Sequence, residues 1–180
     1  RGYCHEKLTF IVPRFAKSAA TLLCCSGDSI VMDKPSELGP VDPQRLDYIR
    51  GVAYSVLSIR ETIKFLDNME KECNNNPEEC NRVISEAVGN LPLMEIGDGL
   101  RALNHIGDYL HELLIEGMFR EEYKSDPLKK EKDINDILLN LIHKHYSHSK
   151  CIDYNTATKI GLKIEVVSKK QWDIIWEIFK

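Results

Sequence analysis

Two short apolar runs near the N-terminus, separated by a run of small residues, constrain the fold more than any other feature of the chain. Residues 8–12 are apolar or β-branched and end at Pro13, which predicts a buried strand that stops there. Residues 29–33 read SIVMD and predict a second buried strand. Residues 18–25 are small and apolar throughout, which is typical of a short buried helix. The chain is therefore expected to begin with a strand, a helix and a strand.

Apolar residues at helical spacing dominate the middle of the chain, and a short α/β segment follows. Gly161 is expected to end a short helix, before a strand over residues 163–167 and a final helix. Strands joined by helices predict an α/β fold with a small sheet and a large helical portion. Four longer helices are expected, over residues 46–72, Pro77 to about Gly89, 98–119 and 133–145.

The bulk composition fits one domain over residues 1–180. Acidic residues outnumber basic ones by 28 to 24 and no basic tract is present, so nucleic acid is not expected as a partner. No apolar run approaches the ~20 residues that cross a bilayer, so membrane association is expected only through segments outside these residues.

The six cysteines do not form a metal-binding or disulfide-framework pattern. Cys24 and Cys25 lie in the predicted buried helix, where a thiol behaves as a small apolar group. Cys73 and Cys80 flank a loop that an oxidising compartment could bridge. Reduced thiols and a cytoplasmic location are the simpler prediction.

Two segments carry a family resemblance. Residues 16–44 read AKSAATLLCCSGDSIVMDKPSELGPVDPQ, and residues 146–166 read YSHSKCIDYNTATKIGLKIEV. Together they resemble the serine dehydrogenase proteinase family, a branch of the fold shared by Clp protease proteolytic subunits, signal peptide peptidase A and crotonases. The resemblance covers the two ends of the chain, and it implies a partial crotonase/Clp-like fold.

The resemblance implies that Ser18 is the nucleophile of a serine peptidase, with the backbone N–H of Ala19 as an oxyanion-hole donor. A serine at the first turn of a helix lies beside N–H groups that favour a developing oxyanion. Serine is also a preferred helix N-cap, so Ser18 could instead only cap the helix.

A serine nucleophile needs a base, and His148 in the second matched segment is the best candidate. Asp33 stands where the Clp subunits place a histidine, and either Asp33 or Asp42 could orient His148. The alternative for His148 is a turn histidine bonded to backbone. Lys17 is adjacent to Ser18, and we expect its side chain to diverge from the hydroxyl.

The segment after the second strand contains three candidates for substrate binding, Gly39, Asp42 and Gln44. They could form a rigid wall that receives an extended peptide. They could equally belong to a turn that joins two layers of the fold. The sequence leaves Asp42 and Gln44 open between these two interpretations.

In this family an earlier βαβ portion supplies a Gly-Gly turn to the oxyanion hole, and nothing before Leu8 resembles that turn. The residues are therefore expected to form the later part of such a domain. By themselves they should be a poor hydrolase, because loss of one oxyanion donor costs about 10²–10³ in rate.

These observations predict a serine hydrolase that acts on a peptide or protein, forms a homo-oligomer and uses neither cofactor nor metal. His143, His145 and His148 are spaced unlike a helical metal site. The alternative function is a non-catalytic interaction or assembly module derived from the same fold. An acyl-thioester enzyme has little support from the residues.

Overall fold

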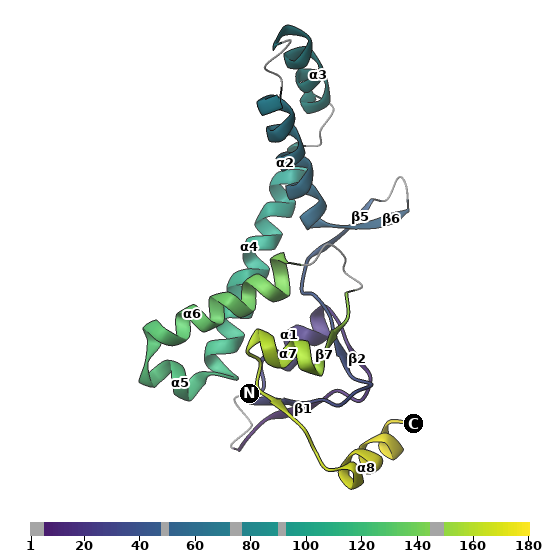
Figure 1. Cartoon of the computed structure of the whole chain (residues 1–180), viewed down its shortest axis with the longest axis vertical. Coiled ribbons are helices and arrows are strands. Elements are labelled where there is room, and N and C mark those ends of the chain that lie inside the picture. Colours follow the sequence, from purple (N-terminus) through teal and green to yellow (C-terminus); the bar gives the residue numbers. More distant parts are fainter. Residues whose placement is uncertain (1–5, 48–50, 73–76, 90–92, 145–149) are drawn as a thin grey trace. The chain divides into compact units, whose positions relative to one another are not determined.

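The computed structural model describes residues 6–47, 51–72, 77–89, 93–144 and 150–180 (Figure 1). The protein is a mixed α/β chain with small sheets and extensive helix, as the sequence predicts. It divides into two compact units. Unit 1 comprises Arg1–Asp42 and Ile106–Lys180, and unit 2 comprises Pro43–His105.

The first sheet of unit 1 is parallel and has the strand order β1-β3-β8. Strands β1 (Thr9–Ile11) and β3 (Ser29–Val31) confirm the two strands predicted near the N-terminus. Strand β8 (Ile164–Glu165) lies inside the predicted range 163–167. All three residues of β3 are buried because it is the central strand.

The second sheet has the order β2-β4-β7, with β4 parallel to β2 and antiparallel to β7. These strands are β2 (Phe15–Ala16), β4 (Glu37–Leu38) and β7 (Ile152–Asp153). Leu38 and Ile152 oppose each other and are fully buried. This sheet therefore joins a segment near the N-terminus to one that lies more than a hundred residues later.

Helix α1 (Ala19–Cys25) connects the two sheets and confirms the predicted short buried helix. Cys24 and Cys25 are buried in it as free thiols. Burial raises the pKa of Cys24 to about 11 and also raises the pKa of Cys25. Both thiols are therefore neutral near pH 7 and pack as small apolar groups.

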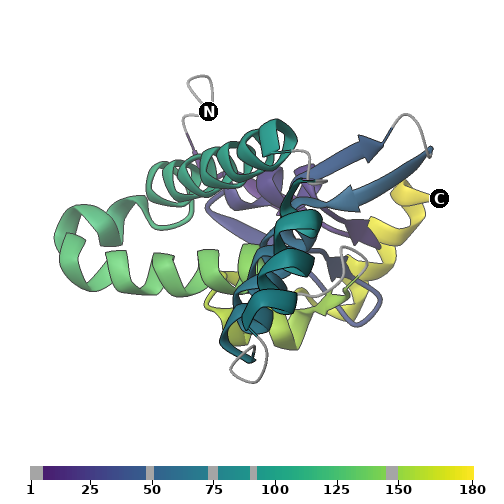
Figure 2. The ribbon, with the colours of Figure 1, turned by 90° about the horizontal axis from the view of Figure 1, so that it is seen from above.

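The rest of unit 1 is mainly helical. Helix α5 (Arg120–Ser125) lies between α4 (Leu93–Glu116) and α6 (Pro127–Leu138), which run in opposite directions (Figure 2). A π-helical turn, η2 (Leu139–His143), continues α6. The buried side chains of these helices include Leu110, Leu114, Ile134, Ile137, Leu141 and Ile142, and Met118 is buried in the turn between α4 and α5.

Two helices end unit 1. Helix α7 (Tyr154–Ile160) is capped by the Asp153 carboxylate and ends at Gly161, whose φ of 106° confirms the predicted glycine cap. Helix α8 (Lys169–Phe179) begins at a capping box formed by Ser168 and Gln171. Its apolar face includes Trp172, Ile175, Trp176 and Phe179, yet none of its residues is buried.

Unit 2 contains a hairpin and helices, and here one prediction is wrong. The helix expected over residues 46–72 begins only at Val56, as α2 (Val56–Glu72). The residues before it form an antiparallel hairpin of β5 (Gln44–Asp47) and β6 (Val52–Ser55), with Gly51 at a φ of 66°. Helix α3 (Pro77–Gly89) has the predicted bounds.

Within unit 2, the start of α2 packs against α4. Val56 and Ile59 are buried, and a Cβ added at Gly99 would lie 2.8 Å from Cδ1 of Ile59. Glycine at this position therefore allows α4 to approach α2 closely.

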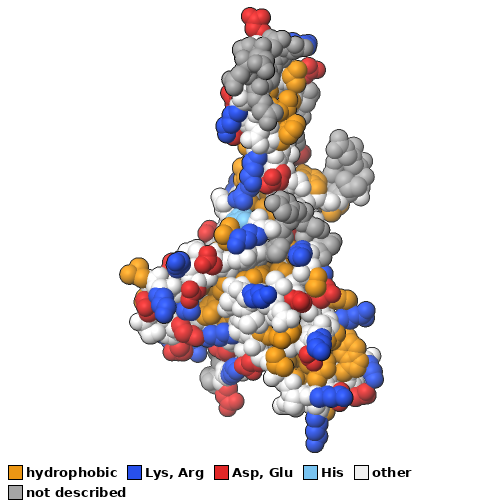
Figure 3. Space-filling view, viewed as in Figure 1, with side chains coloured by type: hydrophobic (Ala, Val, Ile, Leu, Met, Phe, Trp, Pro, Cys, Tyr) orange, Lys and Arg blue, Asp and Glu red, His pale blue; other side chains and the backbone are white. Residues whose placement is uncertain are grey.

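None of the helices in the described ranges is both long enough and apolar enough to span a bilayer. On the face seen in Figure 3, Lys and Arg side chains lie interspersed with Asp and Glu. The described residues on that face form no continuous basic surface of the kind that binds nucleic acid.

Candidate functional site

The turn between β2 and α1 holds Ser18 in an unusual backbone conformation. Ser18 has φ 54° and ψ −118°, and the Ala20 N–H donates to the Lys17 carbonyl at 3.1 Å. These values define a type II′ turn with Ser18 at the position that glycine normally occupies. Ser18 is the only non-glycine residue with positive φ in the described part of the chain. Such a conformation costs about 1–3 kcal/mol and persists only where its surroundings enforce it.

The Ser18 hydroxyl does not cap α1. The structure shows no hydrogen bond from the first turn of the helix to this side chain, although Ser18 occupies the N-cap position. Asp153 and Ser168 do cap their own helices. The alternative that Ser18 serves only as a helix cap is therefore wrong, and the hydroxyl is half-buried beside exposed Ala19 and Ala20.

Thr21 ties this turn to the end of β4. Its fully buried hydroxyl lies 2.7 Å from the Ala16 carbonyl and 2.9 Å from the Gly39 carbonyl, and it accepts from the Gly39 N–H at 3.2 Å. One hydroxyl therefore joins the last residue of β2 to the residue that follows β4. Thr21 lies in the matched sequence segment, but the sequence pattern did not predict that its hydroxyl joins two strand ends. The signal that could have shown this is a single polar residue within an otherwise apolar helix.

Gly39 lies beneath the Lys17 side chain. It is buried, and a Cβ added there would lie 3.0 Å from both Cβ and Cγ of Lys17. Gly39 therefore has a clear packing role at the turn, and its predicted contact with substrate stays a prediction.

Asp33 lies in the turn that follows β3. Its carboxylate accepts from the Lys34 N–H at 2.8 Å, and its own N–H donates to the Ser36 hydroxyl at 2.9 Å. The Ser36 hydroxyl in turn donates to the Val12 carbonyl at 2.6 Å. Asp33 is thus held by its own turn, and its predicted role in orienting a histidine stays a prediction.

His148, the predicted base, lies outside the described residues. The described chain resumes at residue 150, and Ile152 of β7 pairs with Leu38 of β4. Leu38 immediately precedes Gly39, which bonds to Thr21. Strand β7, four residues after His148, therefore joins the same sheet that presents the Ser18 turn.

The two remaining predicted residues belong to different units. Asp42 is buried at the end of the first segment of unit 1, next to Val41, whose N–H donates to the Leu141 carbonyl at 2.9 Å. Gln44 is exposed and begins β5 of unit 2. The predicted role of Gln44 in substrate binding therefore stays a prediction.

A cavity of about 410 Å³ begins beside Ala19, the predicted oxyanion donor. It follows the exposed face of α1 and the part of α4 that belongs to unit 1. Most of its lining is apolar, and its side chains include half-exposed Leu23 and Tyr109. The full lining comprises Leu8, Ala19, Leu22, Leu23, Ser26, Tyr109, Leu113, Glu116 and Gly117.

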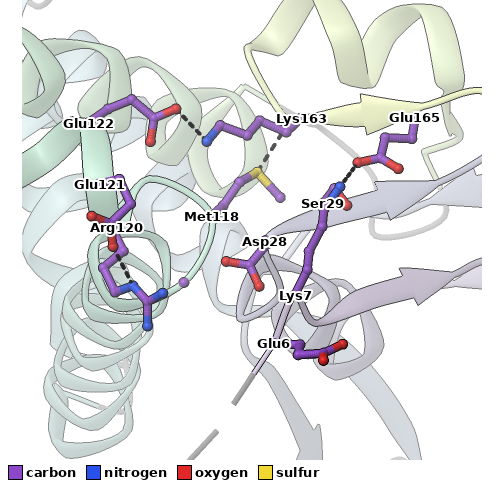
Figure 4. Close-up of a pocket in the computed structure, with 11 residues that line it drawn as sticks. Glu6, Lys7, Asp28, Ser29, Met118, Arg120, Glu121, Glu122, Lys163 and Glu165 are labelled. Atoms are coloured by element: carbon purple, nitrogen blue, oxygen red, sulfur yellow. Dashed lines mark hydrogen bonds and ion pairs between the residues drawn. The ribbon is translucent and has the colours of Figure 1, made fainter. Parts of the chain in front are cut away.

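A second cavity, of about 470 Å³, is lined by charged side chains (Figure 4). Its basic residues are already paired with carboxylates: Lys7 with Glu165, Lys163 with Glu122, and Arg120 with Glu121.

The hydrogen bond from Lys7 lowers the pKa of Glu165. An anionic ligand would have to displace such carboxylates, so this cavity is a weaker candidate site than the Ser18 turn. Across the described ranges, no three His, Cys, Asp or Glu side chains are grouped to hold a metal ion.

The comparisons with known proteins find two relatives in Methanocaldococcus jannaschii. Uncharacterized protein MJ1495 is 30% identical over 112 residues, which cover 57% of this chain and 37% of the relative. Uncharacterized protein MJ0137 is 25% identical over 170 residues, which cover 94% of this chain and 48% of the relative. The chain thus spans less than half the length of either relative. No family model and no solved structure matches it.

Proposed function

We propose that this chain is part of a serine peptidase of the Clp-like superfamily, with Ser18 as its nucleophile. The observation that carries the proposal is the strained type II′ turn at Ser18, between a strand and a helix. A sharp strand-to-helix turn is how other serine hydrolases expose a nucleophilic hydroxyl. The resemblance of residues 16–44 to the serine dehydrogenase proteinase family supports the same assignment.

In the proposed reaction, Oγ of Ser18 attacks the carbonyl carbon of a peptide bond while a base takes the hydroxyl proton. The carbonyl oxygen becomes an oxyanion, to which the Ala19 N–H donates a hydrogen bond. The base returns the proton to the departing amine, and an ester to Ser18 forms. Water then attacks this ester and releases the acid.

His148 is the proposed base, since imidazole accepts and returns protons near neutral pH. The pairing of β7 with β4 supports this choice, because Gly39, which directly follows β4, bonds to Thr21 near Ser18. Asp33 or Asp42 is proposed to orient the imidazole. Substrate binding is proposed for Gly39, Asp42 and Gln44.

The cavity beside Ala19 is proposed to bind an apolar side chain of the substrate, next to the peptide bond that is cut. Leu22, Leu23 and Leu113 contribute apolar surface there, and apolar groups bind apolar pockets. The relatives are more than twice as long as the segments they share with this chain. Peptidase activity of a longer protein that contains this chain is part of the same proposal.

The test is reaction of the full chain with a fluorophosphonate, in which Oγ of serine displaces fluoride from phosphorus. We expect covalent labelling of the folded protein and none in Ser18→Ala. Absence of labelling in a folded protein would favour the alternative function, a non-catalytic assembly module. The matched control is Ser125→Ala, because Ser125 is an exposed residue at the end of α5 and lines neither of the two cavities described above.

A further inference from the structure

We propose that Lys17 is a positioning residue that holds the Ser18 turn in its reactive conformation, an inference that rests on the proposed function of Ser18. Lys17 directly precedes the strained residue, and its carbonyl accepts the hydrogen bond that closes the turn. Whatever fixes Lys17 therefore also fixes the peptide group from which Ser18 is presented.

The stem of Lys17 is fixed by contact with Gly39. A Cβ at position 39 would lie 3.0 Å from Cβ, 3.0 Å from Cγ and 3.2 Å from Cδ of Lys17. Three consecutive carbons of the side chain thus pack along the backbone of a buried glycine. The apolar part of a lysine commonly packs in this way while its charged end reaches a polar partner.

The ammonium end of Lys17 is fixed by Glu37. Nζ of Lys17 lies 3.1 Å from Oε2 of Glu37, and both side chains are about one-third exposed, at 32% and 31%. Glu37 belongs to β4 and Gly39 directly follows this strand, so one short segment, residues 37–39, contacts both ends of the lysine side chain. A charged ammonium group only donates hydrogen bonds, so in this pair Lys17 does not act as the base.

Thr21 provides a second attachment to the same strand end. Its hydroxyl bonds to the backbone of Gly39, three residues after Ser18 along the chain. Ser18 thus lies between two residues, Lys17 and Thr21, that are both attached at β4. Two attachments on either side of one residue are what a strained conformation needs in order to persist.

The test measures the rate of fluorophosphonate labelling of the full chain at several probe concentrations. In Lys17→Met the stem remains and the ammonium is lost. We expect the maximal labelling rate to fall about tenfold, within the loss of up to about 10² that misplacement of a reacting group causes. The probe concentration that gives half the maximal rate should not change. Lys17→Arg, which can still pair with Glu37, should recover most of the rate.

Glu37→Gln should slow labelling as much as Lys17→Met, because each variant removes the same Lys17–Glu37 ion pair. For the same reason the double variant should label no more slowly than either single variant. The control is Lys180→Met, which removes an ammonium paired with Glu177 at the C-terminal end of α8. It should label at the wild-type rate. Thermal unfolding of every variant checks that each is folded.

Wild-type labelling of folded Lys17→Met would overturn the positioning role and leave the proposed function intact. A changed half-maximal probe concentration with an unchanged maximal rate would also overturn it, because Lys17 would then bind the probe. An unlabelled wild-type chain would contradict the proposed function and the positioning role together.

Discussion

At residue 18 the chain keeps a serine where the backbone favours glycine. The φ of 54° and ψ of −118° suit a residue without a side chain, and the hydroxyl makes no capping bond that would offset the strain. The nearby attachments through Thr21 and Lys17 hold the turn in place. The sequence motif was enough to identify Ser18 as a candidate. The positive φ of Ser18 and the contact of Lys17 with Gly39 could not be predicted from the sequence.

Two substitutions of Ser18 should separate the effect of its backbone strain on stability from the effect of its hydroxyl on reactivity. Ser18→Gly relieves the positive φ and should be more stable than Ser18→Ala by about 1 kcal/mol, part of the gain being offset by the flexibility of glycine in the unfolded chain. Both variants lack the hydroxyl and should not react with a fluorophosphonate. Urea unfolding measures the difference, and equal or reversed stabilities would contradict the strained turn.

Removal of the Thr21 hydroxyl should destabilise unit 1. Thr21→Val keeps the shape but leaves the Ala16 carbonyl and the Gly39 N–H without this buried partner. We expect a loss of about 1–3 kcal/mol in the free energy of unfolding. Thr21→Ser keeps the hydroxyl and should lose less. If Val proved as stable as Thr, the hydroxyl would not be the attachment that we describe.

At the scale of elements, capping signals and apolar runs predicted most of the helices and the strands β1, β3 and β8. Strands β2, β4 and β7 have only two residues each and were not predicted. The helix expected over residues 133–145 begins earlier in the structure, at Pro127. In the structure Asp126 caps the helix and Pro127 is its first residue. The hairpin of β5 and β6 was missed because Ile49, Val52, Ala53 and Val56 have helical spacing. In the structure β5 and β6 form a hairpin instead, because the two strands pair and Gly51 adopts a positive φ between them.

The Asp153 cap should make α7 sensitive to pH. Hydrogen bonds from Thr156 lower the pKa of Asp153 in the folded chain. The cap therefore stabilises the protein fully above the ordinary aspartate pKa and loses this effect as pH falls through the lowered value. Asp153→Ala should cost about 1 kcal/mol at neutral pH, and Asp153→Asn much less. The deficit of Asp153→Ala should shrink in acid; a deficit that grew there would contradict the cap.

The exposed Ile178 of α8 should contribute little to the stability of the isolated chain. Ile178 is 82% exposed, whereas Ile137 in α6 is 1% exposed. Ile178→Ala should therefore change the unfolding free energy by less than about 0.5 kcal/mol. Ile137→Ala should cost about 2–5 kcal/mol because it leaves a cavity. Similar losses in the two variants would show that α8 is packed in solution.

At the scale of the whole molecule, the chain consists of two units, and the candidate site lies in unit 1. Ser18, Ala19, Gly39 and the cavity beside α1 all belong to that unit, whereas Gln44 belongs to unit 2. The two matched segments indicated one common fold, and the structure pairs strands β4 and β7, which come from these two segments. The sequence does not reveal that a second unit begins at Pro43, because neighbours along the chain can belong to separate compact units.

The most direct test of the account is to locate the fluorophosphonate adduct by mass spectrometry of the labelled full chain. Tryptic cleavage after Lys17 and Arg45 releases residues 18–45, because Pro35 prevents cleavage after Lys34; this peptide contains Ser18, Ser26, Ser29 and Ser36. The account predicts an adduct on Ser18 alone, which is absent from Ser18→Ala. A folded chain that shows no adduct, or that shows it on Ser26, Ser29 or Ser36, would contradict it.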